Sequence, residues 1–338
     1  MAFRISFMES GFFIIFLLFT CFEVHAQERF EYTHQQMGTQ IRLVFYTTDN
    51  DKADSVASLA FNRIDALNKK LSDYLDNSEL SLLANQVQKE VVVSDDLYRV
   101  LTKAIEISEA TNGAFDISAG PLIQLWRKSR KTKKLPSKLQ LEIAKQNVGY
   151  SHIKFPKKNM VLLKANTMQL DLGGIGKGFA ADEVISILES NGIHSALVDM
   201  GGDIRVSNPP LGKEHWVLAF SYFNELGKEV IKKIRLKNAA VATSGDLFQF
   251  VEIDGVRYSH IINPHTGIAL NNSVQVTTIA NNATEADAFA SAFSVMGISN
   301  VKNNGKVLTN MEVFMVDNSK EGYSKWISEG FNQYVLSE

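Results

Sequence analysis

The only cysteine of this 338-residue chain, Cys21, lies in an apolar N-terminal segment. Arg4 precedes an apolar run over residues 11–22, and Val24-His25-Ala26 follows it. This layout is typical of a secretory signal with a small-residue cleavage site, and the run is shorter than the roughly 20 apolar residues that cross a bilayer. We therefore predict that residues 1–26 are a signal peptide. The mature chain then has no thiol and no disulfide, and its hydrophobic core alone must hold it together.

A second interpretation of the same segment is a lipoprotein. Leu18-Phe19-Thr20-Cys21 would then be a lipid-attachment box with Cys21 acylated, although Thr20 is a poor match to the small residue expected there. Under either interpretation we expect an exported protein, periplasmic or attached to the envelope. Membrane association is expected only if Cys21 is lipidated.

The charge of the exported part argues against nucleic acid as a partner. Removing Arg4, Glu9 and Glu23 from the 35 basic and 37 acidic residues leaves a net charge of −1. That balance offers no basic footprint for a phosphate backbone. The longest charged run, residues 127–134, is interpreted as a solvated basic loop, with a docking surface for a partner protein as the alternative.

The order of periodic segments predicts an α+β fold in which helices come first and an antiparallel sheet follows. The expected elements are strands at residues 40–45 and 196–198, helices at residues 56–71, 95–109, 180–191 and 283–296, and a final strand near residue 313. From Trp216 onward short strands dominate. The clearest hairpin spans residues 248–262, where Asp254-Gly255 supplies the positive φ of a two-residue turn and His260 ends the return strand.

A glycine-rich segment, residues 171–178, enters the helix that starts near Ala180. Its glycines let backbone amides approach an anion, and a helix N-terminus favours phosphate. The position of Lys177 and the absence of a following Ser or Thr exclude a P-loop, and the spacing is not that of a dinucleotide fingerprint. A tight turn without a ligand is the alternative.

Asp287 and Ser291 are four residues apart on the last helix, so their side chains share one face. A carboxylate and a hydroxyl placed in this way suit Mg²⁺, which prefers oxygen ligands. The alternative is a capping box over residues 284–287, in which Asp287 reaches back to the helix start.

Two further segments carry polar side chains. His260 is placed to accept a proton from a hydroxyl, or else it is a hydrogen-bonded structural residue. Residues 241–246 offer hydroxyls and a carboxylate in what we expect to be a turn. Ser244 lacks the surroundings of a nucleophile elbow.

Together these segments resemble the ApbE-like family of FAD:protein FMN transferases over nearly the whole mature chain. The matching segments are Met37-Gly38-Thr39, Tyr74, Ser78-Glu79-Leu80-Ser81, Gly113-Ala114-Phe115-Asp116, Gly120-Pro121-Leu122, Leu125-Trp126, Gly201-Gly202-Asp203, and residues 171–182, 242–246, 260–267 and 286–291. The resemblance implies one T-fold-related α+β unit, an antiparallel sheet flanked by helices, with residues 27–338 as the catalytic domain.

The resemblance also implies an activity: Mg²⁺-dependent transfer of FMN from FAD to a Thr or Ser hydroxyl of an envelope flavoprotein that carries a flavinylation motif, with release of AMP. The residues it places against FAD are Met37, Tyr74, Ala114, Phe115, Asp116, Asp171, Lys177, Ile261 and Ile262. It places Mg²⁺ on Asp287, Ser291 and the Gly174 carbonyl. We predict His260 as the base and Lys177 as a compensating cation.

The chain departs from the family pattern at two places. Ser291 stands where the family usually has Thr, and Asn85 comes one place later than usual after Ser78-Glu79. The alternatives that stay open are an FAD pyrophosphatase that releases FMN and AMP, and a protein that binds or scavenges flavin without catalysis.

Overall fold

The computed structural model describes residues 27–245, 250–319 and 322–336. The predicted signal peptide, with Cys21, lies outside the described residues, as does Asp246.

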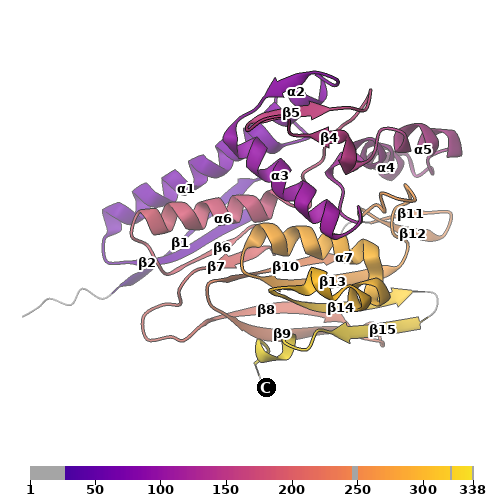
Figure 1. The fold of residues 1–338 in the computed structure, drawn as a ribbon. Coiled ribbons are helices and arrows are strands. Elements are labelled where there is room, and N and C mark those ends of the chain that lie inside the picture. The colour runs from indigo at the N-terminus through magenta and orange to yellow at the C-terminus, as the bar shows by residue number, and fades with distance from the viewer. Residues whose placement is uncertain (1–26, 246–249, 320–321, 337–338) are drawn as a thin grey trace, which may run out of the picture.

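The described chain is built on an eight-stranded antiparallel sheet (Figure 1). Its strand order is β1-β2-β6-β7-β10-β13-β14-β15. The strands are β1 (Glu28–Gln36), β2 (Thr39–Thr47), β6 (Ala196–Asp199), β7 (Ile204–Val206), β10 (Ala239–Gly245), β13 (Ser273–Ala280), β14 (Met311–Ser319) and β15 (Gly322–Ile327). The sheet therefore joins strands from both halves of the chain.

Helices cover one face of this sheet. They are α1 (Asn50–Leu71), α6 (Gly176–Ser190) and α7 (Ala283–Asn303), with α3 (Asp95–Ala110) packed on α1 and α7. In α1 the buried positions Val56, Ala60, Ile64, Leu67 and Leu71 recur at helical spacing and enter the main core. This face carries the largest hydrophobic core of the described protein.

The opposite face is covered by a two-stranded ribbon, β8 (Trp216–Phe223) and β9 (Glu229–Leu236). Alternate residues of β8, among them Phe220 and Tyr222, point toward the sheet and pack against Phe314 and Phe331. The result is three layers, helices on sheet on ribbon (Figure 1).

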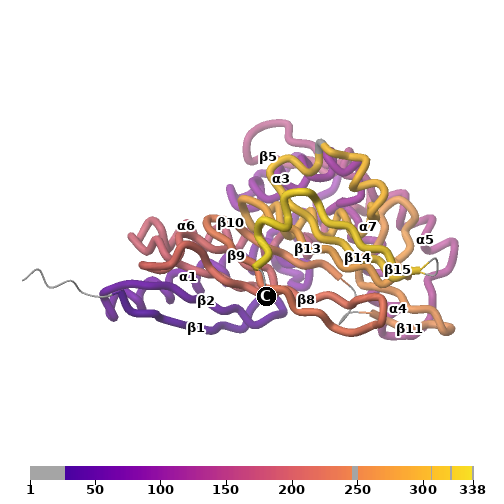
Figure 2. The backbone as a smooth tube through the Cα atoms, turned by 90° about the horizontal axis from the view of Figure 1, so that it is seen from below, coloured from indigo at the N-terminus to yellow at the C-terminus, as the bar shows by residue number. Residues whose placement is uncertain are grey.

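Smaller elements complete the fold. They are α2 (Glu79–Ala84), α4 (Gly120–Thr132), α5 (Lys138–Lys145), the strands β3 (Glu90–Val92), β4 (Ile153–Lys154) and β5 (Met160–Leu163), the hairpin β11 (Phe250–Ile253) and β12 (Val256–Ser259), and short 3-10 helices at Ile117–Ala119, Tyr150–His152, Gly305–Leu308 and Phe331–Gln333. Figures 1 and 2 place α4, α5 and β11 at the end of the molecule away from β1 and β2. The hairpin packs on α4 through Tyr258, whose ring centroid is 5.1 Å from that of Trp126. The Trp126 indole also donates to the carbonyl of Gly267, in the loop that follows the hairpin, at 2.9 Å.

The α+β class, the antiparallel sheet and the predicted helices are confirmed. The hairpin turn is confirmed as well, since Asp254 and Gly255 both have positive φ, 52° and 74°. No helix within the described ranges is long and apolar enough to cross a membrane.

Two local predictions are wrong. The charged run at residues 127–134 is not a loop, because α4 continues to Thr132 and buries Leu122, Trp126 and Ser129 at helical spacing beneath its lysines. Residues 241–245 are not a turn, because they pair along β13 as the strand β10. There the alanines and Val241 are buried in the sheet, and that packing outweighs the turn preference of Ser and Gly.

Candidate active site

The glycine-rich turn lies where α6 meets α7. Its peptide N–H groups at Ile175 and Gly176 both donate to the Leu172 carbonyl, at 3.1 and 2.8 Å, and α6 begins there without a side-chain cap on its first residue. A Cβ on Gly178 would lie 2.1 Å from the Ala283 carbonyl oxygen. Only glycine allows the two helices to approach this closely.

Asp287 of α7 supplies the cap that α6 lacks. Its carboxylate accepts the Gly178 N–H at 3.1 Å. Gly178 is the third residue of α6, so its N–H is one of the first-turn donors that have no carbonyl partner within the helix.

The N-terminus of α7 is capped by other residues. Asn282 accepts the Glu285 N–H at 2.8 Å, while Asp182 of α6 accepts the N–H groups of Ala283 and Thr284, both at 2.9 Å. The interpretation of Asp287 as the cap of its own helix is therefore wrong. Its side chain faces the glycine-rich turn instead.

The charge around Asp287 is incompletely balanced. Burial raises its pKa above the ordinary range of an aspartate, Asp203 raises it further, and Lys177 opposes the shift. Lys177 is already ion-paired with Asp203, and although burial opposes its charge, the carboxylates of Asp203 and Asp287 raise its pKa. One cation thus serves two buried carboxylates, which favours a further cation at this place.

Gly174, Asp287 and Ser291 fit a magnesium ion. A Cβ on Gly174 would lie 3.0 Å from the Ser291 hydroxyl oxygen, so the turn and this side chain are in contact. The described residues hold no group of three or more His, Cys, Asp or Glu side chains that would bind a metal alone. Mg²⁺ commonly uses one or two carboxylates together with substrate phosphates, and one carboxylate, one hydroxyl and one carbonyl agree with that habit.

Met37 and Phe115 lie at the same turn. Met37 occupies the β1–β2 turn with φ 53°, and its methyl carbon is 4.0 Å from the position of a Cβ on Gly176. The ring of Phe115, itself buried, is 3.3 Å from a Cβ on Gly174. Ala114 is buried beside it. The structure therefore brings these predicted FAD contacts to the glycine-rich turn.

Asp171 opens the turn and reaches a cluster that the sequence did not reveal. Its carboxylate accepts the Gly173 N–H at 2.8 Å and a guanidinium N–H of Arg127 at 2.8 Å. Arg127 is also paired with Asp73, and its guanidinium lies 4.2 Å from the ring centroid of the exposed Tyr74. Burial and the neighbouring Asp73 raise the pKa of Asp171, while Arg127 opposes the shift. In the sequence, Arg127 is one of several basic residues in the run 127–134. Only the helical spacing of the buried residues of α4 would have indicated that it faces the protein.

Asp116 is engaged within the protein. One carboxylate oxygen accepts from the Ser118 N–H and hydroxyl at 2.8 and 2.6 Å, and the other accepts the Tyr150 N–H at 2.9 Å. Burial raises its pKa. Its contact with FAD stays a prediction.

His260 follows β12 directly and is half-buried. The Ile261 N–H donates to the Ser259 hydroxyl at 3.0 Å, and the Ile261 carbonyl accepts from Leu270 at 2.9 Å. Ile262 forms an isolated antiparallel bridge with Ala269. The two hydrogen bonds beside this bridge, from the Leu270 N–H to Ile261 and from the Asn263 N–H to Ile268, use neither the N–H nor the C=O of Ile262. The contact of both residues with FAD stays a prediction.

The sequence comparisons agree with one another. The ApbE family model matches residues 37–315. The FAD:protein FMN transferase of Salmonella typhimurium is 29% identical over 313 residues, covering 89% of this chain and 88% of that protein. The one from Vibrio cholerae is 30% identical over 279 residues, covering 80% and 82%.

Solved structures show the same fold. The flavin transferase ApbE from Vibrio cholerae superposes with a TM-score of 0.81 at 28% identity, covering 91% of this chain and 99% of that one. The ApbE protein from Thermotoga maritima gives a TM-score of 0.80 at 31% identity, covering 92% and 100%.

Proposed function

The chain belongs to the ApbE family, and we propose that it is an exported, Mg²⁺-dependent FAD:protein FMN transferase. It transfers FMN from FAD to a Thr or Ser hydroxyl of an envelope flavoprotein and releases AMP. The names of its relatives, FAD:protein FMN transferase, support the flavin transfer. The magnesium, the hydroxyl acceptor and the AMP are our extension.

The observation that carries the proposal is the orientation of Asp287. Its carboxylate does not cap α7, because Asn282 and Asp182 do so. It faces the glycine-rich turn at Gly174 instead, where Ser291 also lies. A bound Mg²⁺ would supply Lewis-acid stabilisation of the charge that builds on the pyrophosphate. Asp287, Ser291 and the Gly174 carbonyl would hold it.

The protein's own residues bind the phosphates and accept the proton. Lys177 and the positive end of the α6 helix dipole bind the phosphates. The acceptor hydroxyl oxygen attacks the phosphorus of the FMN half, the pyrophosphate bond to AMP breaks, and AMP leaves with the bridging oxygen. The hydroxyl proton passes to the His260 imidazole.

The direct test is to incubate residues 27–338 with FAD, Mg²⁺ and a protein that carries a flavinylation motif, and to measure acceptor mass and released nucleotide together. We expect a mass gain of one FMN moiety per acceptor and an equal amount of AMP. Free FMN and AMP with an unmodified acceptor would instead indicate a pyrophosphatase. Intact FAD would indicate a flavin-binding protein.

His260 is tested separately. His260→Ala is expected to bind FAD as the wild type does and to lose transfer, because the incoming hydroxyl then has no base. Transfer at the wild-type rate would remove His260 from the mechanism. His194, an exposed histidine in the loop between α6 and β6, provides the control as His194→Ala, which is expected to leave transfer unchanged.

Export is tested on the full chain by fractionation and by the mass of the mature N-terminus. Cleavage after Ala26 gives an unmodified chain that begins at Gln27. An acylated N-terminal Cys21 would establish the lipoprotein instead.

A further inference from the structure

We infer that Arg127 is a positioning residue that holds the Tyr74 ring as a platform for the flavin ring of FAD, beside the glycine-rich turn. This inference rests on the proposed function, since it concerns how the same site binds FAD. It concerns a residue that the sequence placed in a solvated charged run.

The contacts of Arg127 come from three separate parts of the chain. One guanidinium nitrogen pairs with Asp73 and the other donates to Asp171 at 2.8 Å. The guanidinium carbon lies over the Tyr74 ring, 4.2 Å from its centroid. The side chain of Arg127 is 17% exposed, and those of Asp73 and Asp171 are 13% and 9% exposed. The guanidinium is thus fixed by two carboxylates that are themselves largely shielded from solvent.

Tyr74 differs from these neighbours because 75% of its surface is exposed. An aromatic ring so exposed is usually free to rotate, but here one face rests on a fixed planar cation. The other face is presented to solvent. A flat aromatic ligand is the chemistry that would cover it, since offset stacking adds to the burial of the ring.

The same guanidinium connects the platform to the turn. Asp171, which accepts from Arg127, also accepts the Gly173 N–H at 2.8 Å. A ring stacked on Tyr74 and a pyrophosphate bound at the turn would therefore be held at a fixed separation. Lysine cannot replace arginine here, because a single ammonium has neither the fork that bonds two carboxylates nor the plane that stacks on the ring.

A double-mutant cycle tests this coupling. FAD affinity is measured by flavin fluorescence without Mg²⁺, so that no turnover occurs, for the wild type, Arg127→Lys, Tyr74→Ala and the double variant. We expect Arg127→Lys to weaken FAD binding by about tenfold in the wild-type background, the size of one lost stacking contact, and by less than about twofold when Tyr74 is already Ala. With Mg²⁺ and acceptor, the KM for FAD should rise while kcat stays within about twofold.

The chain offers a matched control. Arg99 of α3 also pairs with a carboxylate, Glu183, at 2.6 Å and lies over an aromatic ring, Phe179, at 5.1 Å, but both partners belong to α6 and neither is a predicted FAD contact. Arg99→Lys is expected to leave FAD affinity unchanged. Thermal melting of each variant reports whether the fold is intact.

Several outcomes would overturn the inference. They are an unchanged affinity in Arg127→Lys, an equal loss in the Tyr74→Ala background, or an equal loss in Arg99→Lys. If Arg127→Lys does not fold, Asp73→Asn loosens the same guanidinium from one side, and it should weaken binding only while Tyr74 is present. A wild type that binds no FAD would overturn the proposed function together with this inference, whereas FMN transfer with an additive cycle would overturn the inference alone.

Discussion

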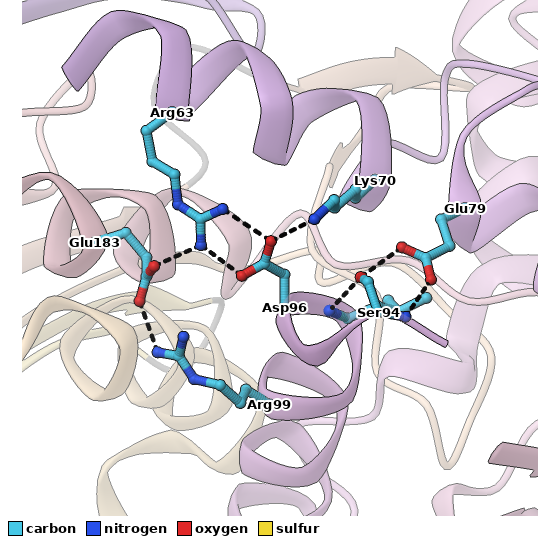
Figure 3. A network of polar contacts seen from close by, with 8 residues as sticks. Arg63, Lys70, Glu79, Ser94, Asp96, Arg99 and Glu183 are labelled. Atoms are coloured by element: carbon cyan, nitrogen blue, oxygen red, sulfur yellow. Dashed lines mark hydrogen bonds and ion pairs between the residues drawn. The ribbon is translucent and has the colours of Figure 1, made fainter. Parts of the chain in front are cut away.

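Asp96 and Asp287 are almost equally buried, 7% and 6% exposed, yet their surroundings shift their pKa values in opposite directions. Asp96, in the first turn of α3, accepts a bidentate pair from Arg63 and a further bond from Lys70, both on α1 (Figure 3). The Arg63 hydrogen bonds hold the pKa of Asp96 well below its usual range. Its charge is neutralised within the protein.

The same network continues to α6 and α2. Glu183 of α6 accepts from Arg63 and from Arg99, and Glu79 of α2 accepts the Ser94 N–H and hydroxyl at the start of α3 (Figure 3). These contacts fix four helices relative to one another. In this network both carboxylate oxygens of Asp96, of Glu183 and of Glu79 have a partner within the protein.

Asp287 has one backbone donor and shares Lys177 with Asp203. A buried carboxylate that is paired with cations of the protein stabilises the fold, whereas a buried carboxylate with too few partners can bind a cation from solution.

The largest effect is expected from Asp287→Asn, which keeps a hydrogen-bond acceptor for Gly178 but removes the charge. Transfer should fall by at least about 100-fold, because the metal loses its only carboxylate. Stability without Mg²⁺ should be unchanged or higher, since an uncompensated buried charge is gone. FMN transfer rates and thermal melting measure the two quantities. A large loss of stability with normal transfer would contradict the metal assignment.

Asp96→Asn is expected to show the reverse. Arg63 and Lys70 lose their shared partner, and the free energy of unfolding should fall by about 2 kcal/mol, less than for a fully buried pair because both cations are partly exposed. Transfer at 25 °C should stay near the wild-type rate. Urea unfolding measures the stability and the transfer assay measures the activity. A loss of activity without a loss of stability would mean that the network belongs to the active site.

Gly174→Ala should act on the site with little effect on the fold. The new Cβ would lie 3.0 Å from the Ser291 hydroxyl and 3.3 Å from the Phe115 ring, so both side chains must move by a few tenths of an ångström. We expect transfer to fall by about tenfold, because a small displacement of metal-binding groups weakens binding. Gly178→Ala is the control, since its Cβ would meet a backbone oxygen and should destabilise the α6–α7 contact.

The pH dependence of stability sharpens the same comparison. The folded pKa of Asp96 is lowered, so its contribution to stability is fully present above its unfolded pKa of about 3.9 and is lost as the pH falls through the folded pKa. The stability difference between the wild type and Asp96→Asn should therefore be constant from neutral pH down to about pH 4 and shrink below it. Unfolding measured in acidic buffers follows this difference, and a gap that widens below pH 4 would contradict the pairing.

Much of this could be predicted from the sequence where the signal is local. Helical spacing gave α1, α3 and α7, and Asp254-Gly255 gave the hairpin. The four-residue spacing of Asp287 and Ser291 led to the prediction of a metal site on α7, but it could not decide between metal ligand and helix cap. That choice depends on Asp182, which lies about a hundred residues earlier in the chain and caps α7.

Arg127 was not predicted for the same reason, because its partners are distant in the sequence. Arg127 is 54 residues from Asp73 and 44 from Asp171, so its environment exists only once α4 has packed. Within α4 the neighbouring lysines hid the buried spacing of Leu122, Trp126 and Ser129. Sheet order was out of reach for the same reason, since β2 pairs with β6 across α1 to α6.

The smallest effect is expected from Ser291→Thr, the residue usual in the family. Threonine keeps the hydroxyl and adds one methyl on a side chain that is only half-buried, so transfer should stay within about threefold of the wild type at saturating Mg²⁺. Ser291→Ala is the matched control and should raise the Mg²⁺ concentration needed for half-maximal transfer, because an oxygen ligand is lost. A Mg²⁺ titration of both variants makes the measurement. If alanine titrates like threonine, the hydroxyl is not a ligand, and Asp287 with the Gly174 carbonyl must hold the ion with help from substrate and water alone.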